Sequence, residues 1–187
     1  MVDTAYSIVD LSVTGHEGIE QAASILFESF RQDWPDAWPS LESARQEVLE
    51  CLEPGKICRA SINQHGQVLG FVGATSQYRG RVYELHPMCV IPSLQGRGLG
   101  SALVTDLVER VRDRGGRTIY LGTDDENDLT SASSANLFDE PWRHIRDLKA
   151  KSRHPLEFYR KLGFVVVGLV PDANGPGKPD IMMARGI

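Results

Sequence analysis

The sequence predicts an α/β (α+β) protein in which helices cover a mixed, mostly antiparallel central sheet. A short apolar run is followed by two helical patterns, three strand-like runs then follow with turns between them, and the last strands alternate with helices. Helices that interrupt a series of meander strands are typical of one sheet covered by helices. A length of 187 residues fits one domain, which we expect to span residues 1–187.

The first elements are expected between residues 7 and 52. Residues 7–13 are rich in Ile, Val and Leu and predict a strand. Apolar residues in 19–30 recur at a spacing of three and four, which predicts an amphipathic helix. Two prolines in residues 35–39 prevent this helix from continuing. Ser40 is a natural N-cap for a second helix over residues 41–52.

The middle of the chain predicts three strands and the clearest helix. Residues 57–62 and 68–74 are apolar runs around 63–67, whose composition is that of a hairpin loop. Residues 82–91 form a third run, and an apolar stripe over 99–111 predicts a helix that stops at a glycine pair.

The C-terminal part predicts a strand at 118–121, a helix at 156–162, and strands at 164–170 and 181–184. The connection 123–155 is longer than most loops, so it is either functional or contains a helix of its own. Four of its apolar residues have helical spacing and favour the helix: Phe138, Trp142, Ile145 and Leu148.

The charge and the cysteines exclude several classes of protein. With 25 acidic and 20 basic residues the formal charge is -5, which argues against a nucleic-acid partner and suits a cationic substrate. Cys51, Cys58 and Cys89 show no Cys-x-x-Cys spacing, so neither a disulfide framework nor a zinc site is expected, and a reducing cytoplasm fits. The histidines also lack metal-ligand spacing, so no metal is predicted.

No secretion signal or membrane anchor is expected. Residues 1–13 carry acidic residues and no basic one. The longest apolar stretch, residues 164–170, is far shorter than the roughly 20 residues of a spanning helix. We therefore expect a cytoplasmic protein without a membrane partner.

A glycine-rich loop, Gln95-Gly96-Arg97-Gly98-Leu99-Gly100, lies between a predicted strand and the clearest helix. Its glycines let the backbone approach a ligand, and the helix behind directs free N–H groups toward it, which favours phosphate binding. An ordinary glycine-rich turn is the alternative. The loop is neither a Walker motif nor a good dinucleotide fingerprint.

The loop resembles the acetyl-CoA loop of the Gcn5-related N-acetyltransferases, whose pattern Gln/Arg-x-x-Gly-x-Gly/Ala is met by Gln95, Gly98 and Gly100. A second element of that family, an aromatic-Tyr pair before Gly-Phe, is matched by Phe158-Tyr159 and Gly163-Phe164. From about Trp34 onward the chain resembles the aminoglycoside 6'-N-acetyltransferase branch. The matching segments are Tyr83 to Met88, Ile119 to Asp125, His154 to Tyr159 and Pro171 to Ile181.

This resemblance implies the acyl-CoA N-acyltransferase fold, with a splayed strand pair, and acetyl-CoA as co-substrate. The pantetheine arm would lie between the splayed strands and pair with backbone groups of Met88 to Val90. The expected coenzyme-binding residues are Met88, Cys89, Val90, Gln95, Gly96, Arg97, Gly98, Leu99, Gly100 and Ser101.

Three residues are candidates for the chemistry. Tyr159 matches the family's general acid near the coenzyme sulfur, with a core tyrosine as the alternative. Strand alternation would place Glu84, His86 and Met88 on one face, and Pro87 would make the strand bulge or splay. Glu84 would hold the acceptor ammonium or take its proton through water, whereas His86 is equally well a structural histidine.

The acceptor site is expected to contain Asp124, Asp125 and Trp34. Asp124 matches the family's substrate-contacting aspartate, and clustered carboxylates suit a substrate with several ammonium groups. The alternatives are a solvated loop for the acidic run and core packing for Trp34. A calcium loop is disfavoured because Leu129 stands where its glycine is needed.

Together these features predict direct transfer of acetyl from acetyl-CoA to the 6'-amine of aminoglycosides, which confers resistance. Cys89 and His86 suggest a covalent route, but a cysteine near a strand proline is more often inert core. The alternatives are another polyamine, small-molecule or protein amine as acceptor, or a non-catalytic acetyl-CoA-binding module. Residues 132–135 and the surroundings of Trp142 differ from the branch and would affect substrate range. A homodimer is expected from the resemblance and the apolar C-terminal strands.

Overall fold

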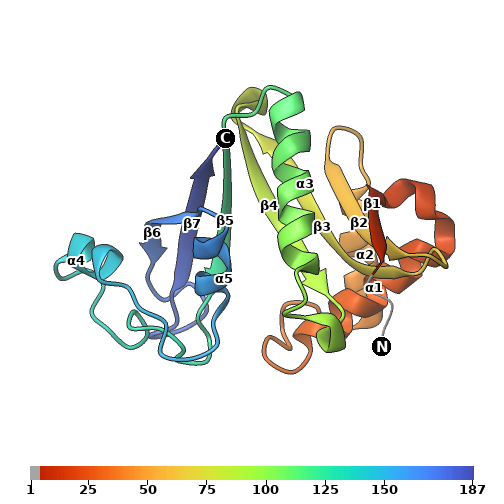
Figure 1. Cartoon of the computed structure of the whole chain (residues 1–187). Coiled ribbons are helices and arrows are strands. Elements are labelled where there is room, and N and C mark those ends of the chain that lie inside the picture. Colours follow the sequence, from red (N-terminus) through yellow and green to blue (C-terminus); the bar gives the residue numbers. More distant parts are fainter. Residues whose placement is uncertain (1–4) are drawn as a thin grey trace. The chain divides into compact units, whose positions relative to one another are not determined.

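The structure is a computed structural model that describes residues 5–187 (Figure 1). Its contacts group the chain into two compact units, the first ending at Arg117 and the second spanning Thr118–Ile187. One domain over residues 1–187 stays a prediction. No helix in the described part of the chain is both long enough and apolar enough to cross a bilayer.

Between residues 5 and 117 the first unit contains four strands and three α-helices, close to the expected positions. They are β1 (Tyr6–Asp10), α1 (Gly15–Phe30), α2 (Leu41–Cys51), β2 (Ile57–Asn63), β3 (Val68–Gln77), β4 (Val82–Val90) and α3 (Leu99–Asp113). Short 3-10 turns lie at Leu11–Thr14, Tyr78–Gly80 and Pro92–Leu94. The strands pair antiparallel in the order β1-β2-β3-β4.

The first strand is shorter than predicted. It ends at Asp10, whose side chain accepts a hydrogen bond from the Ser12 amide at 3.0 Å and thereby caps a 3-10 turn. Val13, expected in the strand, is consequently exposed. The predicted cap of α2 is confirmed, because Ser40 and Ser43 form a reciprocal capping box.

Helices cover both faces of this four-stranded sheet (Figure 1). α1 and α2 share a buried apolar cluster with residues of β2, β3 and β4, including Cys58, Phe71 and Cys89. α3 packs across the other face through a fully buried stripe that includes Leu103 and Leu107. This burial on both sides explains the near-continuous apolar character of β3.

β4 contains a bulge at Pro87, as its sequence predicted. Leu85 pairs with Ala74 and Met88 pairs with Val72, so two residues of β4 lie opposite Gly73 alone. A Cβ atom on Gly73 would lie 2.5 Å from the carbonyl oxygen of His86, which makes any larger residue clash with β4.

The bulge changes which β4 side chains share a face. Paired residues of antiparallel strands point to the same side, and the pair Phe71 and Cys89 belongs to the cluster beneath α1 and α2. His86 also lies on that side, where its ring packs on Trp38. Met88, next to Cys89, therefore faces the side of α3. The expectation that Met88 shares a face with Glu84 and His86 is wrong, because the extra residue shifts the alternation by one.

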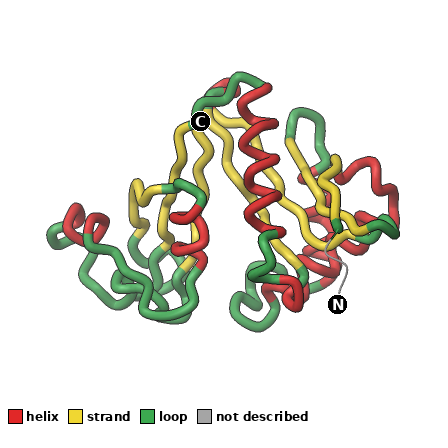
Figure 2. The backbone as a smooth tube through the Cα atoms, viewed as in Figure 1, coloured by secondary structure: helices red, strands yellow, loops and turns green. Residues whose placement is uncertain are grey.

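The second unit contains a three-stranded antiparallel sheet and two short helices. Its elements are β5 (Thr118–Asp124), α4 (Pro141–Arg146), α5 (Pro155–Lys161), β6 (Val165–Val170) and β7 (Asp180–Gly186). β7 pairs with both β5 and β6. Figure 2 shows that loops make up most of residues 125–154. The helix in this segment, α4, is shorter than expected, because it includes Trp142 and Ile145 but neither Phe138 nor Leu148. Phe138 and Trp142 are both 78% exposed.

Candidate functional site

The glycine loop of the first unit is an exposed turn that leads directly into α3. Gln95 donates a hydrogen bond to the carbonyl oxygen of Val90 at 3.3 Å, which ties the loop to the end of β4. Gly96 and Gly98 have φ angles of +74° and +89°, a region that other residues enter only at a cost. Added Cβ atoms at these two glycines would meet nothing within 4 Å, so the backbone conformation, not crowding, requires glycine there.

The start of α3 suits an anion. Gly98 is the N-cap, and no side chain caps this end of the helix. The first N–H groups of a helix lack partners within the helix and lie at the positive end of its dipole. Because Arg97 is exposed beside them, the loop offers both amides and a cation to a phosphate group. The coenzyme-binding residues predicted from Met88 to Ser101 thus lie along one continuous stretch, and their role stays a prediction.

His86, a candidate of the first unit, lies beside a carboxylate that the sequence analysis missed. Its Nε2 atom is 3.7 Å from an oxygen of Glu47 on α2, and its ring centroid is 5.8 Å from that of Trp38. Trp38 donates its indole N–H to the other Glu47 oxygen at 3.4 Å. Glu47 could have been found from its spacing, since it lies three residues after the buried Ala44 on the inward side of an amphipathic helix.

The candidate Trp34 belongs to the same aromatic group. Its ring packs on Phe30 with centroids 5.6 Å apart, and Phe30 packs edge-on against Trp38 at 4.7 Å. Trp34 is half-buried whereas Trp38 is buried, so Trp34 keeps the exposed surface that a ligand wall needs. Glu84 is also half-buried and pairs with Thr75 of β3. The roles of Trp34 and Glu84 stay predictions.

Tyr159, the candidate acid, lies in the second unit on α5. Its ring contacts Phe158 and Phe164 edge-on, with centroids 5.0 and 5.5 Å away. Only 9% of the residue is exposed, and this burial raises the pKa of its phenol. The phenol therefore carries its proton at neutral pH, as a proton donor must.

The carboxylate of Asp125 binds groups of its own loop. It is fully buried and accepts hydrogen bonds from the backbone N–H groups of Leu129 and Thr130 and from the hydroxyl of Ser133. Burial by itself would raise the pKa of Asp125, but these hydrogen bonds outweigh it and lower the pKa. We expected Asp125 to contact substrate, yet its carboxylate is occupied inside the protein and organises residues 125–133.

Asp124 lies beside a second carboxylate that the sequence analysis did not single out. Its side chain accepts a hydrogen bond from Asn174 at 2.6 Å, and the register of β5 and β7 places Asp180 directly opposite. Burial and the charge of Asp124 raise the pKa of Asp180 to about 6. One oxygen of Asp180 is buried without a hydrogen-bond partner among residues 5–187. Gly122 leaves room for this carboxylate, since a Cβ atom there would collide with it.

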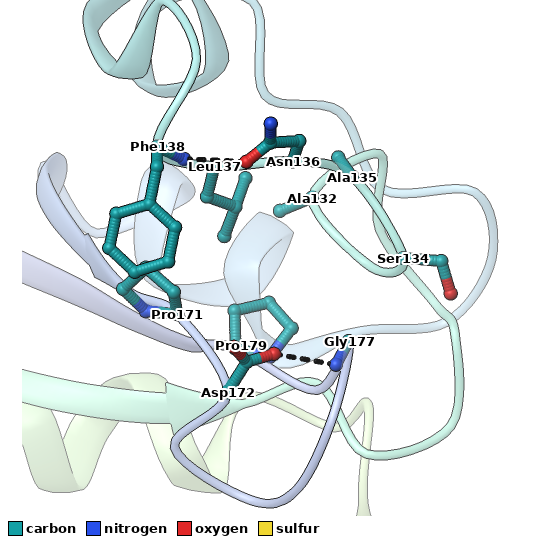
Figure 3. A pocket seen from close by; sticks show the side chains of 10 residues that line it. All are labelled: Ala132, Ser134, Ala135, Asn136, Leu137, Phe138, Pro171, Asp172, Gly177 and Pro179. Atoms are coloured by element: carbon teal, nitrogen blue, oxygen red, sulfur yellow. Dashed lines mark hydrogen bonds between the residues drawn. The ribbon is translucent and has the colours of Figure 1, made fainter.

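A cavity of about 320 Å³ lies between two loops of the second unit (Figure 3). Leu137, Phe138, Pro171 and Pro179 provide its apolar surface. Ala132, Ser134 and Ala135 of the segment 132–135 supply part of the lining. The cavity therefore includes residues where we expected substrate range to be decided.

Potential metal ligands and thiols are the remaining groups that could carry chemistry. Among residues 5–187 no three His, Cys, Asp or Glu side chains gather as metal ligands would. Cys89 is 5% exposed, and burial raises the pKa of its thiol, so it is not a ready nucleophile.

Each unit carries part of the predicted set. The first holds Trp34, Glu84, His86 and the coenzyme loop, and the second holds Asp124, Asp125 and Tyr159. Glu47, Trp38 and Asp180 are further neighbours of these candidates that the sequence analysis did not single out.

Comparisons with known proteins identify the family. A model of the acetyltransferase (GNAT) family matches residues 20–131. A search of curated proteins finds no match. A solved structure of an aminoglycoside 6'-N-acetyltransferase complexed with coenzyme A is 35% identical to this chain, with a TM-score of 0.88 over 96% of both chains.

Two further structures agree with this match. The aminoglycoside 6'-N-acetyltransferase from Enterococcus faecium is 35% identical, with a TM-score of 0.86, and aminoglycoside 6'-acetyltransferase type Ii is 33% identical, with a TM-score of 0.72. Both cover 96% of each chain. The predicted fold class, a mixed and mostly antiparallel sheet covered by helices, is confirmed. Because the family model matches more than half of the chain, this protein belongs to the GNAT family of acetyltransferases.

Proposed function

We propose that this acetyltransferase moves the acetyl group of acetyl-CoA to the 6'-amine of aminoglycosides by direct attack and so confers resistance to them. The observation that carries the proposal is the similarity to aminoglycoside 6'-N-acetyltransferases over 96% of the chain at 33–35% identity. The carboxylates of Asp124 and Asp180 support it, because a polycationic acceptor needs anionic partners.

Acetyl-CoA is assigned to the first unit. The uncapped N–H groups of α3 and the side chain of Arg97 would bind the pyrophosphate. Backbone groups of Met88 to Val90 would pair with the pantetheine arm as an added strand does. An N–H group of this segment would then stabilise the oxyanion that forms on the thioester.

The transfer itself requires a neutral amine and a proton for the departing sulfur. The amine nitrogen attacks the thioester carbon, a C–N bond forms, and the C–S bond breaks as the tetrahedral intermediate collapses. Glu84 would take the amine proton through water, and Tyr159 would give its phenolic proton to the thiolate. Burial raises the pKa of Tyr159, so its phenol is protonated at neutral pH and has a proton to donate.

A thiol-release assay with acetyl-CoA tests the proposal. We expect turnover with aminoglycosides that carry a 6'-amine and none with analogues that carry a 6'-hydroxyl, with NMR of the product placing the acetyl group on the 6'-nitrogen. Release with polyamines or peptides instead would refute the substrate assignment. Tight coenzyme binding without turnover on any amine would refute catalysis.

The acceptor assignment has a matched control. Asp124→Asn removes a charge but keeps an oxygen that can accept the hydrogen bond from Asn174. Asp128→Asn removes a charge from the same acidic run at an exposed position. We expect the KM of the aminoglycoside to rise for the first variant only.

We also propose a homodimer in the cytoplasm. Support for the dimer comes from β6, where Val165, Val167 and Val170 are 61%, 53% and 45% exposed. Light scattering of the purified protein should give twice the mass of one 20.7 kDa chain, and a monomer at micromolar concentration would refute the dimer.

A further inference from the structure

His154 is a buried histidine that the proposed reaction does not use. It is 5% exposed and lies at the end of the long loop, immediately before α5. Both of its ring nitrogens have partners in different parts of the second unit. Nδ1 is 3.1 Å from the backbone nitrogen of Leu156, and Nε2 is 3.1 Å from the carbonyl oxygen of Asp124.

These partners determine the protonation of the ring. The Leu156 N–H can only donate, so Nδ1 must accept, and the Asp124 carbonyl can only accept, so Nε2 must carry the hydrogen. The ring is therefore the neutral Nε2–H tautomer. A second proton would have to enter on Nδ1, where it would break the bond to Leu156.

The two bonds join the end of β5 to the start of α5. Asp124 is the last residue of β5, and His154 is the N-cap of α5. A helix of seven residues is too short to be stable by itself, so contacts with its surroundings must hold it. At its other end Arg185 donates to the Leu162 carbonyl oxygen at 2.8 Å.

The same bonds connect two residues with proposed roles in the reaction. The carboxylate of Asp124 is held by Asn174, and its backbone carbonyl is held by His154. Tyr159 lies five residues after His154, which is roughly 7.5 Å along the helix. A displacement of His154 would therefore move both Asp124 and Tyr159.

We propose that His154 is a positioning residue of acetyl transfer, which holds α5 against the end of β5 and so keeps Tyr159 in place relative to Asp124. This inference rests on the roles proposed for Tyr159 and Asp124. His154 itself neither touches substrate nor transfers a proton.

Two substitutions separate the contacts of His154. In His154→Asn the shorter side chain can still accept from Leu156, as asparagine does at helix N-caps, but it does not span both partners. In His154→Ala both bonds are lost. His65→Asn, at an exposed position of the β2–β3 hairpin, is the control for the same chemical change.

We expect His154→Asn to lower kcat/KM for the acceptor on the order of tenfold, since small displacements of reacting groups are costly. Its affinity for acetyl-CoA should stay close to wild type, and its melting temperature should fall by less than that of His154→Ala. His154→Ala should show at least the same catalytic loss and, in addition, a melting temperature lower by roughly 2–4 °C. His65→Asn should leave every measurement unchanged.

The inference is overturned if the wild type is active and the His154→Asn variant keeps the full kcat/KM. The bond between His154 and Asp124 would then have no effect on acetyl transfer. The inference is also overturned if the loss of kcat/KM in His154→Asn and His154→Ala simply follows the loss of melting temperature. If the wild type acetylates no amine, the proposed function fails first and the inference fails with it. The first two results leave the proposed function intact, so the two failures are distinguishable.

Discussion

Gly98 is the position where the proposed coenzyme site can be tested with least damage to the fold. Its φ of +89° is costly for alanine, by about 1–2 kcal/mol. No atom lies within 4 Å of an added Cβ, so Gly98→Ala introduces backbone strain without a clash. The loop can relieve the strain only by leaving the conformation that presents the first amides of α3.

The same helix provides the control. Gly115 follows the C-terminal end of α3 with a φ of +81°, and its Cβ would also meet nothing within 4 Å. Where each loop keeps its conformation, Gly98→Ala and Gly115→Ala should destabilise the protein by similar amounts. At about 1–2 kcal/mol, each should lower the melting temperature by several degrees.

Only the variant at the N-terminal end should affect coenzyme binding. If the loop must recover the strained conformation to bind acetyl-CoA, its affinity falls by the cost of the strain, which is roughly 5- to 30-fold. Titration calorimetry with acetyl-CoA measures this directly. Equal affinities for the two variants would refute the reasoning that places the pyrophosphate on this loop.

Four further predictions concern the second unit. Tyr159→Phe should lower kcat by about 100-fold, the scale of general acid catalysis, while calorimetry shows unchanged acetyl-CoA affinity. Asp124→Asn should raise the acceptor KM, and an effect confined to acetyl-CoA would contradict its role. Because Asp180 has a pKa raised to about 6, acceptor binding should strengthen as pH rises through 6, and Asp180→Asn should remove this dependence in titrations across that range. Burial lowers the pKa of His154 below its unfolded value of about 6.5. The neutral ring should therefore stabilise the folded protein fully above a pH of about 6.5, and this stabilisation should be lost as the pH falls through the lowered pKa. The free energy of unfolding should depend less on pH in His154→Asn than in the wild type.

The elements were predictable because their signals are local. An amphipathic stripe such as that of α3 reports which side chains are buried, whatever the helix packs against. The bulge in β4 was predictable from Pro87, which cannot donate a ladder hydrogen bond. The face of the sheet on which Met88 lies was not predictable from the sequence. It depends on the register between β4 and Gly73 of β3, which is a long-range property.

The candidate site divides in the same way. The glycine loop and the Phe158-Tyr159 pair are short motifs, so the sequence alone pointed to them. Glu47, His154 and Asp180 have no such motif of their own. Their significance comes from partners distant along the chain: His86 for Glu47, and Asp124 for both His154 and Asp180. Asp125 was noticed in the sequence as part of an acidic run, but the run did not reveal that its carboxylate is the one that faces inward.

The chemistry of the three cysteines bears on whether acetyl is transferred directly. Cys51, Cys58 and Cys89 all lie in the buried cluster beneath α1 and α2. Burial raises the pKa of Cys89, and a hydrogen bond with Cys51, together with burial, raises that of Cys58. A thioester is attacked by a thiolate, so the raised pKa values of Cys58 and Cys89 make these two poor candidates for an acetyl-enzyme. A neutral acceptor amine that binds beside the thioester can attack without first losing a proton. This contrast favours direct attack, which needs the amine proton to be removed, the role proposed for Glu84.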